Sequence, residues 1–374
     1  MKNYIFNNKI LGVIALSLLI MVGGSCSKWT DMESLTIEKP DIESQNSGLY
    51  ADYLESLRNY KKEDHKIVYV SFDNDETKQS SRAYHVASLP DSIDIVALKH
   101  PNNLSSQLQQ EIAEAREKKG MKFVVDIDFD ALKADYDQLI EDYEEELAKQ
   151  QADSEEPKEG EEGEAENAEE GEVEQPIDFI DYMVGRLQDD FKAVNKYNYD
   201  GITISYKGRN SRHMIPEEYE VYINRENAFL KSLIGMQENS KTSLFLFNGY
   251  PQNVVDKTQL ESFDYIIIPC IDATNESQLM YNVLTSLTEG VPTDNLVISG
   301  TMTSLDPTDN KTGIWSDGGL AIKAIANWAN ATYADFSIAG VSIELVNNDY
   351  FNAKKDYLNV REVVDILNPS IKTK

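Results

Sequence analysis

The 374-residue sequence predicts an α/β fold: a (β/α)8 TIM barrel that carries a disordered acidic insertion. Eight strand-like segments lie between Ile67 and Leu345, and patterns typical of helices separate most of them. Eight β/α units in about 300 residues match the size of such a barrel. The first strand is not followed by a glycine-rich phosphate-binding motif, which argues against a dinucleotide-binding fold.

The predicted strands are runs of β-branched and aromatic residues bounded by polar residues or glycine. They cover residues 67–72, 92–98, 122–128, 199–208, 243–250, 264–272, 295–301 and 340–345. The predicted helices repeat apolar residues three and four positions apart, as expected where one face packs on a sheet. They cover residues 49–60, 104–118, 177–194, 215–236, 278–289, 321–334 and 360–367. This alternation predicts parallel pairing of the strands.

The N-terminus has the features of a bacterial export signal. Lys2 and Lys9 give it a basic start, and residues 10–22 form an apolar run that is short for a membrane span. Small residues stand directly before Cys26, in a pattern that resembles a bacterial lipobox. We therefore expect Cys26 to be lipidated and to become the mature N-terminus. An ordinary signal peptide that happens to precede a cysteine is the alternative.

These features predict three segments. Residues 1–25 are a lipoprotein signal peptide, residues 26–48 are the lipidated N-terminus and a polar tether, and residues 49–374 form the barrel. We expect an outer-membrane lipoprotein at the cell surface, attached to the membrane through its lipid.

Residues 150–175 interrupt the barrel pattern. From 151 to 175 the chain has twelve acidic residues, one lysine and no aromatic residue. Such a composition buries too little apolar surface to offset the entropy lost on ordering, so we predict a disordered insertion in a surface loop. A cation-binding or partner-binding tail is the alternative. The formal net charge of −30, to which this segment contributes, excludes nucleic acid as an expected partner.

Cysteine and histidine usage indicates neither a disulfide framework nor a metal site. With Cys26 used as an anchor, Cys270 is the one remaining cysteine, and the apolar run around it predicts a core thiol. The four histidines lack metal-ligand spacing. We therefore predict no metal and no cofactor.

The predicted strand at residues 199–208 reads Tyr-Asp-Gly-Ile-Thr-Ile-Ser-Tyr-Lys-Gly. It resembles the signature strand of the family 18 glycoside hydrolases, the chitinases and endo-β-N-acetylglucosaminidases, whose motif is Asp-Gly-x-Asp-x-Asp-x-Glu. Asp200 and Gly201 match this motif. The later acidic positions are occupied by Thr203, Ser205 and Lys207.

Residues 52–61 and 89–96 are also similar to Bacteroidetes lipoproteins related to family 18, so the resemblance covers about residues 50–368. It implies the barrel fold and substrate-assisted hydrolysis. In that mechanism the motif's glutamate protonates the leaving oxygen, and the aspartate two positions earlier orients the substrate's N-acetyl group. Lys207 stands at the glutamate position and Ser205 at the aspartate position. We therefore predict that the chain has no catalytic residue in this motif.

Polar and aromatic residues stand at or just beyond the carboxyl ends of the predicted strands, where TIM barrels carry their sites. Aromatic rings stack on sugar rings, and amides and carboxylates hydrogen-bond to sugar hydroxyls. The candidate glycan-binding residues are Phe72, Asn74, Asp126, Asp128, Tyr206, Lys207, Asn248, Tyr250, Asp272, Trp315, Glu344 and Tyr350. For each aromatic residue, packing in the core or at the rim is the alternative.

The resemblance and these residues predict a non-catalytic surface lipoprotein that captures N-acetylglucosamine-containing glycans such as N-glycans. We expect it to hold an oligosaccharide for partner glycosidases and an outer-membrane glycan importer. The first alternative is an active endo-β-N-acetylglucosaminidase-like hydrolase that uses relocated carboxylates, with Asp126, Asp128, Asp272 and Glu344 as the candidates. An adhesin or scaffold with a vestigial cleft is the second.

Overall fold

A computed structural model describes residues 46–155, 176–240 and 242–369. The chain forms two units, Met1–Asp52 and Tyr53–Lys374, and the barrel belongs to the second. The predicted signal peptide, Cys26 and almost all of the predicted tether lie outside the described residues, as does most of the acidic insertion. Among the helices described, none combines the length and the apolar character that a membrane crossing requires.

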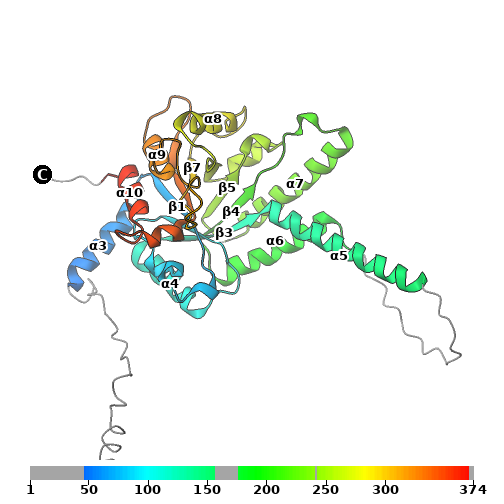
Figure 1. Ribbon diagram of the computed structural model, residues 1–374, viewed down its shortest axis with the longest axis horizontal. Helices are drawn as coiled ribbons and strands as arrows, with labels where there is room; N and C mark the ends of the chain where they lie inside the picture. Colours follow the sequence, from blue (N-terminus) through cyan, green and yellow to red (C-terminus); the bar gives the residue numbers. More distant parts are fainter. Residues whose placement is uncertain (1–45, 156–175, 241, 370–374) are drawn as a thin grey trace, which may run out of the picture. The chain divides into compact units, whose positions relative to one another are not determined.

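Eight parallel strands close into a barrel in sequence order, with β8 paired to β1 (Figure 1). Each strand pairs with the strands before and after it in the chain. The strands are β1 Ile67–Phe72, β2 Ile95–Leu98, β3 Lys122–Asp128, β4 Gly201–Tyr206, β5 Leu244–Gly249, β6 Tyr265–Pro269, β7 Leu296–Thr301 and β8 Ile338–Glu344. The predicted (β/α)8 barrel is therefore confirmed, and all eight predicted strand segments form strands.

Most of the helices connect successive strands of the barrel, while one precedes β1 and one follows β8 (Figure 1). They are α3 Ser47–Tyr60, α4 Ser106–Lys119, α5 Phe129–Glu155, α6 Phe179–Lys196, α7 Pro216–Glu238, α8 Glu276–Ser286, α9 Ala321–Ala329 and α10 Leu358–Leu367. Three short 3₁₀ helices, Glu76–Lys78, Arg82–Tyr84 and Val86–Ser88, fill the connection from β1 to β2. Helix α5 extends to Glu155, so residues 151–155 are helical, in contrast to the predicted disorder of the insertion from residue 150 onward.

Apolar residues form two clusters, one on each side of the sheet. The larger cluster packs the outer face of the strands against the helices, and it includes Ile202, Ile204 and Tyr206 of β4. Cys270 belongs to the same cluster and is buried, in agreement with the predicted core thiol. The smaller cluster fills the barrel interior and includes Tyr69 of β1. The period-2 alternation of a strand explains this division.

Aspartates hold the entry of three strands against their neighbours. One stands directly before each of β2, β4 and β6, and its carboxylate accepts a hydrogen bond from a backbone N–H of the preceding strand. The three pairs, each 2.8 Å apart, are Asp94 with Val68, Asp200 with Phe123 and Asp264 with Phe245. These contacts satisfy N–H groups at the amino ends of the strands and fix how adjacent strands meet.

The pair Asp200-Gly201 has a structural role at the entry of β4. The Asp200 carboxylate also accepts a hydrogen bond of 2.8 Å from Arg116 Nε on α4, which ties the helix to the sheet. Gly201 lies so close to β5 that a Cβ atom would come within 2.3 Å of the Leu244 carbonyl oxygen. A side chain at position 201 would therefore push β5 away from β4.

We predict that Asp200→Ala destabilises the barrel. The substitution leaves the Phe123 N–H and the Arg116 guanidinium without their acceptor, which costs about 2–3 kcal/mol of unfolding free energy. Urea unfolding followed by circular dichroism measures the change. The exposed Asp335, changed to alanine, is the control and should shift the free energy by less than about 0.5 kcal/mol. Equal effects of the two substitutions would contradict the role assigned to Asp200.

Candidate functional site

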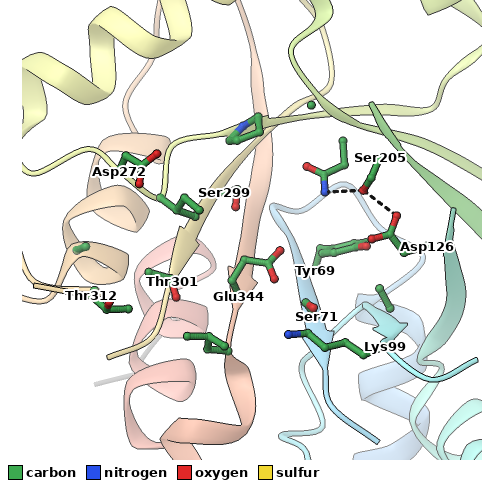
Figure 2. A pocket seen from close by; sticks show the side chains of 18 of the residues that line it. Tyr69, Ser71, Lys99, Asp126, Ser205, Asp272, Ser299, Thr301, Thr312 and Glu344 are labelled. Carbon is green, nitrogen blue, oxygen red and sulfur yellow. Dashed lines mark hydrogen bonds between the residues drawn. The ribbon is translucent and has the colours of Figure 1, made fainter. Parts of the chain in front are cut away.

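A pocket of about 970 Å³ opens at the carboxyl ends of the strands, and residues from all eight strands line it. Its volume lies within the range of small-molecule binding sites. Figure 2 shows that Tyr69, Asp126 and Glu344 lie near one another, whereas Asp272 and Thr312 lie on the opposite side. The lining is rich in hydroxyl, amide and carboxylate groups, which are the hydrogen-bonding partners of sugar hydroxyls.

Seven of the twelve predicted glycan-binding residues line this pocket. They are Asp126, Asp128, Tyr206, Lys207, Asn248, Asp272 and Glu344. The remaining five are absent from its lining: Phe72, Asn74, Tyr250, Trp315 and Tyr350. The structure thus brings most of the predicted carboxylates and amides together, while it separates the predicted aromatic residues from them.

Strand alternation explains the residues of β1 that miss the pocket. Phe72 is fully buried in the outer core, and Asn74 is 1% exposed, with its amide bonded to the backbone N and O of His100. Their neighbours Ser71 and Asp73 line the pocket instead. The prediction selected the right strand end and the wrong face of it.

The other aromatic candidates also serve packing. Trp315 and Tyr350 are partly buried against the outer core, and Tyr250 is half-buried beyond β5. Tyr206 contributes to the pocket lining, yet its ring packs outside the barrel against Phe129 and Phe229. These four rings therefore provide no sugar-stacking platform at the pocket floor in this structure.

Several pocket residues that lie within strands were not among the predicted candidates. Tyr69, Ser71, Ser205 and Ser299 are the clearest cases, and Lys99 directly follows β2. The four strand residues occupy inward-facing positions, at the spacing of two that places alternate residues on one face. That alternation is the sequence signal that could have found them.

The three positions of the signature strand that differ from the motif make specific contacts in or near the pocket. The Thr203 hydroxyl lies 3.2 Å from the Tyr69 hydroxyl inside the barrel. The Ser205 hydroxyl donates a 2.7 Å hydrogen bond to Asp126 Oδ1 (Figure 2). The Lys207 ammonium group forms a 3.2 Å ion pair with Asp130 at the start of α5. The mismatches therefore place neutral or cationic groups where the motif has carboxylates.

Asp126 and Glu344 carry the electrostatic character of the pocket. Enclosure by the barrel walls raises the pKa of Asp126 to about 7, and the charges of Asp128 and Glu344 act in the same direction. Solvent still reaches Asp126 through the pocket opening. Burial likewise raises the pKa of Glu344, and Lys99 opposes the shift of both carboxyls. Two carboxyl groups with raised pKa values thus line the same pocket.

One group of described side chains has the composition of a cation site. Ligand atoms of Asp73, Asp75 and His100 at the pocket rim lie within 4.8 Å of one another. The Lys78 ammonium group lies 3.1 Å from Asp73 and 3.2 Å from Asp75. Because this lysine already supplies a positive charge to both carboxylates, the group does not require a metal.

Comparison with known protein families identifies the family of this chain. Residues 30–366 match the sequence profile of glycoside hydrolase family 18, BT1044-like. The chain belongs to this family. The predicted resemblance to family 18 is therefore confirmed, and it extends over most of the chain. No curated protein sequence matches the chain at a significant level.

Solved structures of family 18 proteins support the same fold. A glutamate-to-glutamine variant of BT1044 shares 17% identity, covers 87% of this chain and 95% of its own, and has a TM-score of 0.58. The endo-β-N-acetylglucosaminidase of Cordyceps militaris shares 13% identity, covers 85% and 96% of the two chains, and has a TM-score of 0.57. At these identities the likeness concerns the barrel.

Within this family 18 barrel, the two ends of the signature strand have different roles. The two positions that match the motif, Asp200 and Gly201, hold β4 between its neighbours at the amino end of the barrel. Ser205 and Lys207, which replace acidic residues of the motif, line the pocket at the other end. The strand has kept the contacts that build the fold and carries different chemistry at the site.

We predict that Asp126→Asn stabilises the protein, increasingly so from pH 5 to about pH 7, with a constant difference at higher pH. The raised pKa means that the unfolded chain loses this proton at lower pH than the folded protein, so Asp126 lowers stability progressively as the pH rises from about 4 to about 7, and the loss is constant above that pH. Asparagine removes that charge and can still accept the hydrogen bond from Ser205.

Thermal unfolding at a series of pH values measures this effect. Asp272→Asn, at an exposed carboxylate of the same pocket, is the matched control and should show no comparable trend. A constant difference between Asp126→Asn and the unsubstituted protein from pH 5 to pH 7 would contradict the prediction.

Proposed function

We propose that this family 18 barrel binds glycans without cleaving them, as a surface lipoprotein that captures N-acetylglucosamine-containing glycans such as N-glycans. The observation that supports the proposal best is the environment of Lys207. This residue stands at the motif's general-acid position, lines the pocket and is ion-paired with Asp130.

A lysine in this setting is a poor substitute for a catalytic glutamate. The Asp130 carboxylate raises the pKa of Lys207 above its ordinary value, so the ammonium group holds its proton at neutral pH. General acid catalysis requires a group whose pKa lies near the working pH. Ser205, at the aspartate position, carries no charge with which to stabilise a cationic intermediate, and its hydroxyl proton is already donated to Asp126.

The remaining pocket suits recognition of a sugar. Hydroxyl, amide and carboxylate groups of Ser71, Asn248 and Glu344 line it, together with those of Asp126. In a related solved structure, a double variant of the Cordyceps militaris endo-β-N-acetylglucosaminidase is in complex with fucosyl-N-acetylglucosamine-asparagine, and it has 13% identity and a TM-score of 0.54 to this chain. Such ligands are the class that we propose for this pocket.

The proposed setting follows from the N-terminal sequence. A lipid on Cys26 would hold the barrel at the outer membrane, facing the cell surface. There it would present bound oligosaccharide to partner glycosidases and to an outer-membrane importer. A binding protein that does not cleave its ligand is suited to this position, because it retains glycan for proteins that process or transport it.

We predict that the purified protein in detergent binds a chitobiose-core N-glycan and releases no product from it. Isothermal titration calorimetry measures the binding, and mass spectrometry of the glycan after prolonged incubation detects cleavage. Failure to bind any N-acetylglucosamine-containing glycan would refute the proposed function.

A second candidate function is hydrolysis by relocated carboxylates, and the raised pKa values of Asp126 and Glu344 favour it. One carboxyl that is protonated near neutral pH beside another carboxyl is a pattern found in glycosidases. Cleavage that disappears in Asp126→Asn or Glu344→Gln, while the glycan still binds, would establish this function in place of capture.

We predict that Cys26→Ser releases the protein from the membrane fraction. Serine cannot form the thioether through which a lipobox cysteine carries its lipid. Metabolic labelling with a palmitate analogue, followed by membrane fractionation, measures the change, and Cys270→Ser is the matched control because the Cys270 thiol is buried in the barrel. A labelled or membrane-bound Cys26→Ser protein would contradict lipidation at this residue.

A further inference from the structure

We propose that Glu226, a residue outside the pocket, is a positioning residue for it: its buried carboxylate fixes the end of β4 and thereby the place of the Lys207 ammonium group in the pocket, on which glycan affinity depends. The inference rests on the proposed glycan-binding function and names a residue that controls it from outside the lining. It follows from hydrogen bonds that join β4 to helix α7 and to the segment after β5.

Glu226 places an acidic side chain in the protein core, where such a group is costly unless donors surround it. It lies on α7 and is 1% exposed. Its Oε2 accepts a 2.6 Å hydrogen bond from the Tyr206 hydroxyl on β4. Its Oε1 accepts a 2.8 Å hydrogen bond from the Val255 N–H, between β5 and β6. Because both oxygens accept, the carboxylate holds three separate parts of the chain together.

A second tyrosine extends this contact to the backbone that follows Lys207. The Tyr206 proton is directed to Glu226, so the Tyr222 hydroxyl, 2.9 Å from the Tyr206 hydroxyl, is the donor in that pair. The Tyr222 oxygen in turn accepts a 2.9 Å hydrogen bond from the backbone N–H of Arg209. The chain of donors therefore runs from Arg209 through the two hydroxyls to Glu226, and it ties the segment after β4 to α7.

The backbone of residues 207–209 is also held from the side of β5. Asn253 Nδ2 donates a 2.9 Å hydrogen bond to the Lys207 carbonyl oxygen. Gly208 has a φ of +57°, and a Cβ atom there would come within 2.8 Å of Tyr206 Cε1 and 2.9 Å of the Tyr222 hydroxyl. The absence of a side chain at position 208 lets this segment lie directly against both tyrosines. The backbone of Lys207 is therefore fixed on two sides.

The same tyrosine ring places the ion-pair partner of Lys207. The Tyr206 ring packs on Phe129, the first residue of α5, with the ring centroids 5.3 Å apart. The next residue, Asp130, forms the 3.2 Å ion pair with Lys207. The Lys207 side chain is 66% exposed, and an ion pair this exposed holds a charge only weakly. The place of the ammonium group thus depends on the two backbone positions that Tyr206 and Glu226 fix.

Calorimetry on the complete protein with a chitobiose-core N-glycan tests the proposal. Tyr206→Phe removes the hydroxyl and keeps the ring, and Glu226→Gln removes one of the two acceptors. Each should lower affinity about threefold to tenfold, the equivalent of one lost hydrogen bond. Gly208→Ala, which forces the two tyrosines apart, should have the same effect. The controls are two exposed residues, Tyr281→Phe on α8 and Glu220→Gln on α7, which should change affinity less than about twofold. Circular dichroism confirms that each variant is folded.

A double-mutant cycle with Lys207→Ala separates positioning from a structural role. If Glu226 acts through Lys207, then Glu226→Gln should lower affinity less than about twofold in the Lys207→Ala background, because the group that it positions is absent. Lys207→Ala alone should lower affinity at least as much as Glu226→Gln does. Equal losses from Glu226→Gln in both backgrounds would show a merely structural role and overturn the proposal, as would unchanged affinity in Lys207→Ala.

A measurement without glycan keeps this inference separate from the proposed function. The Asp130 carboxylate raises the pKa of Lys207, so NMR titration of the complete protein with ¹³C-labelled lysine reports their proximity. Glu226→Gln should lower the pKa of Lys207, as Asp130→Asn does, and Glu220→Gln should leave it unchanged. An unchanged pKa of Lys207 in Glu226→Gln would refute the positioning role, whether or not glycan binds. A lowered pKa in a protein that binds no glycan would support the positioning of Lys207 and refute glycan capture.

Discussion

The hydrogen bond between the Phe123 N–H and the Asp200 carboxylate is the contact on which the pocket geometry depends. It holds the entry of β4 against β3, while Arg116 holds the same carboxylate from α4. Once the entry is fixed, strand periodicity determines where every later residue of β4 points. Ser205 then lies inward, within hydrogen-bonding distance of Asp126 on β3. A shift of one residue would turn that hydroxyl outward and break its hydrogen bond with Asp126.

In this barrel, the residues that stabilise the fold and the residues that determine the chemistry of the pocket lie at opposite ends of β4. Asp200 and Gly201 act at the amino end of β4, where they satisfy a backbone N–H and allow close approach of β5. Ser205 and Lys207 act at the carboxyl end, where nothing in the packing requires a carboxylate. Substitution at the pocket end therefore leaves the fold intact. Lys207 is also neutralised by Asp130, so its charge causes no local repulsion.

Much of the fold and part of the site could be predicted from residue patterns. Strand runs and helix periods are local, so all eight strands were found, and the signature strand pointed to family 18. Site prediction selected residues at the carboxyl ends of the strands, which captured Asp126 and Glu344 and missed Tyr69 in the middle of β1. It also chose Phe72, whose ring faces the outer core. The error arises because a strand end shows where a site lies, but inward or outward orientation depends on the register of the neighbouring strands.

The sequence by itself determined the barrel and the absence of the motif's glutamate, because each depends on residue type at a short spacing. Only the tertiary structure decided which side chains meet. Asp126, Ser205 and Asn248 come from three separate strands, and Glu344 joins them in one pocket from β8, more than two hundred residues after Asp126. Barrel closure brings these residues together, because the pairing of neighbouring strands determines which side chains face the pocket.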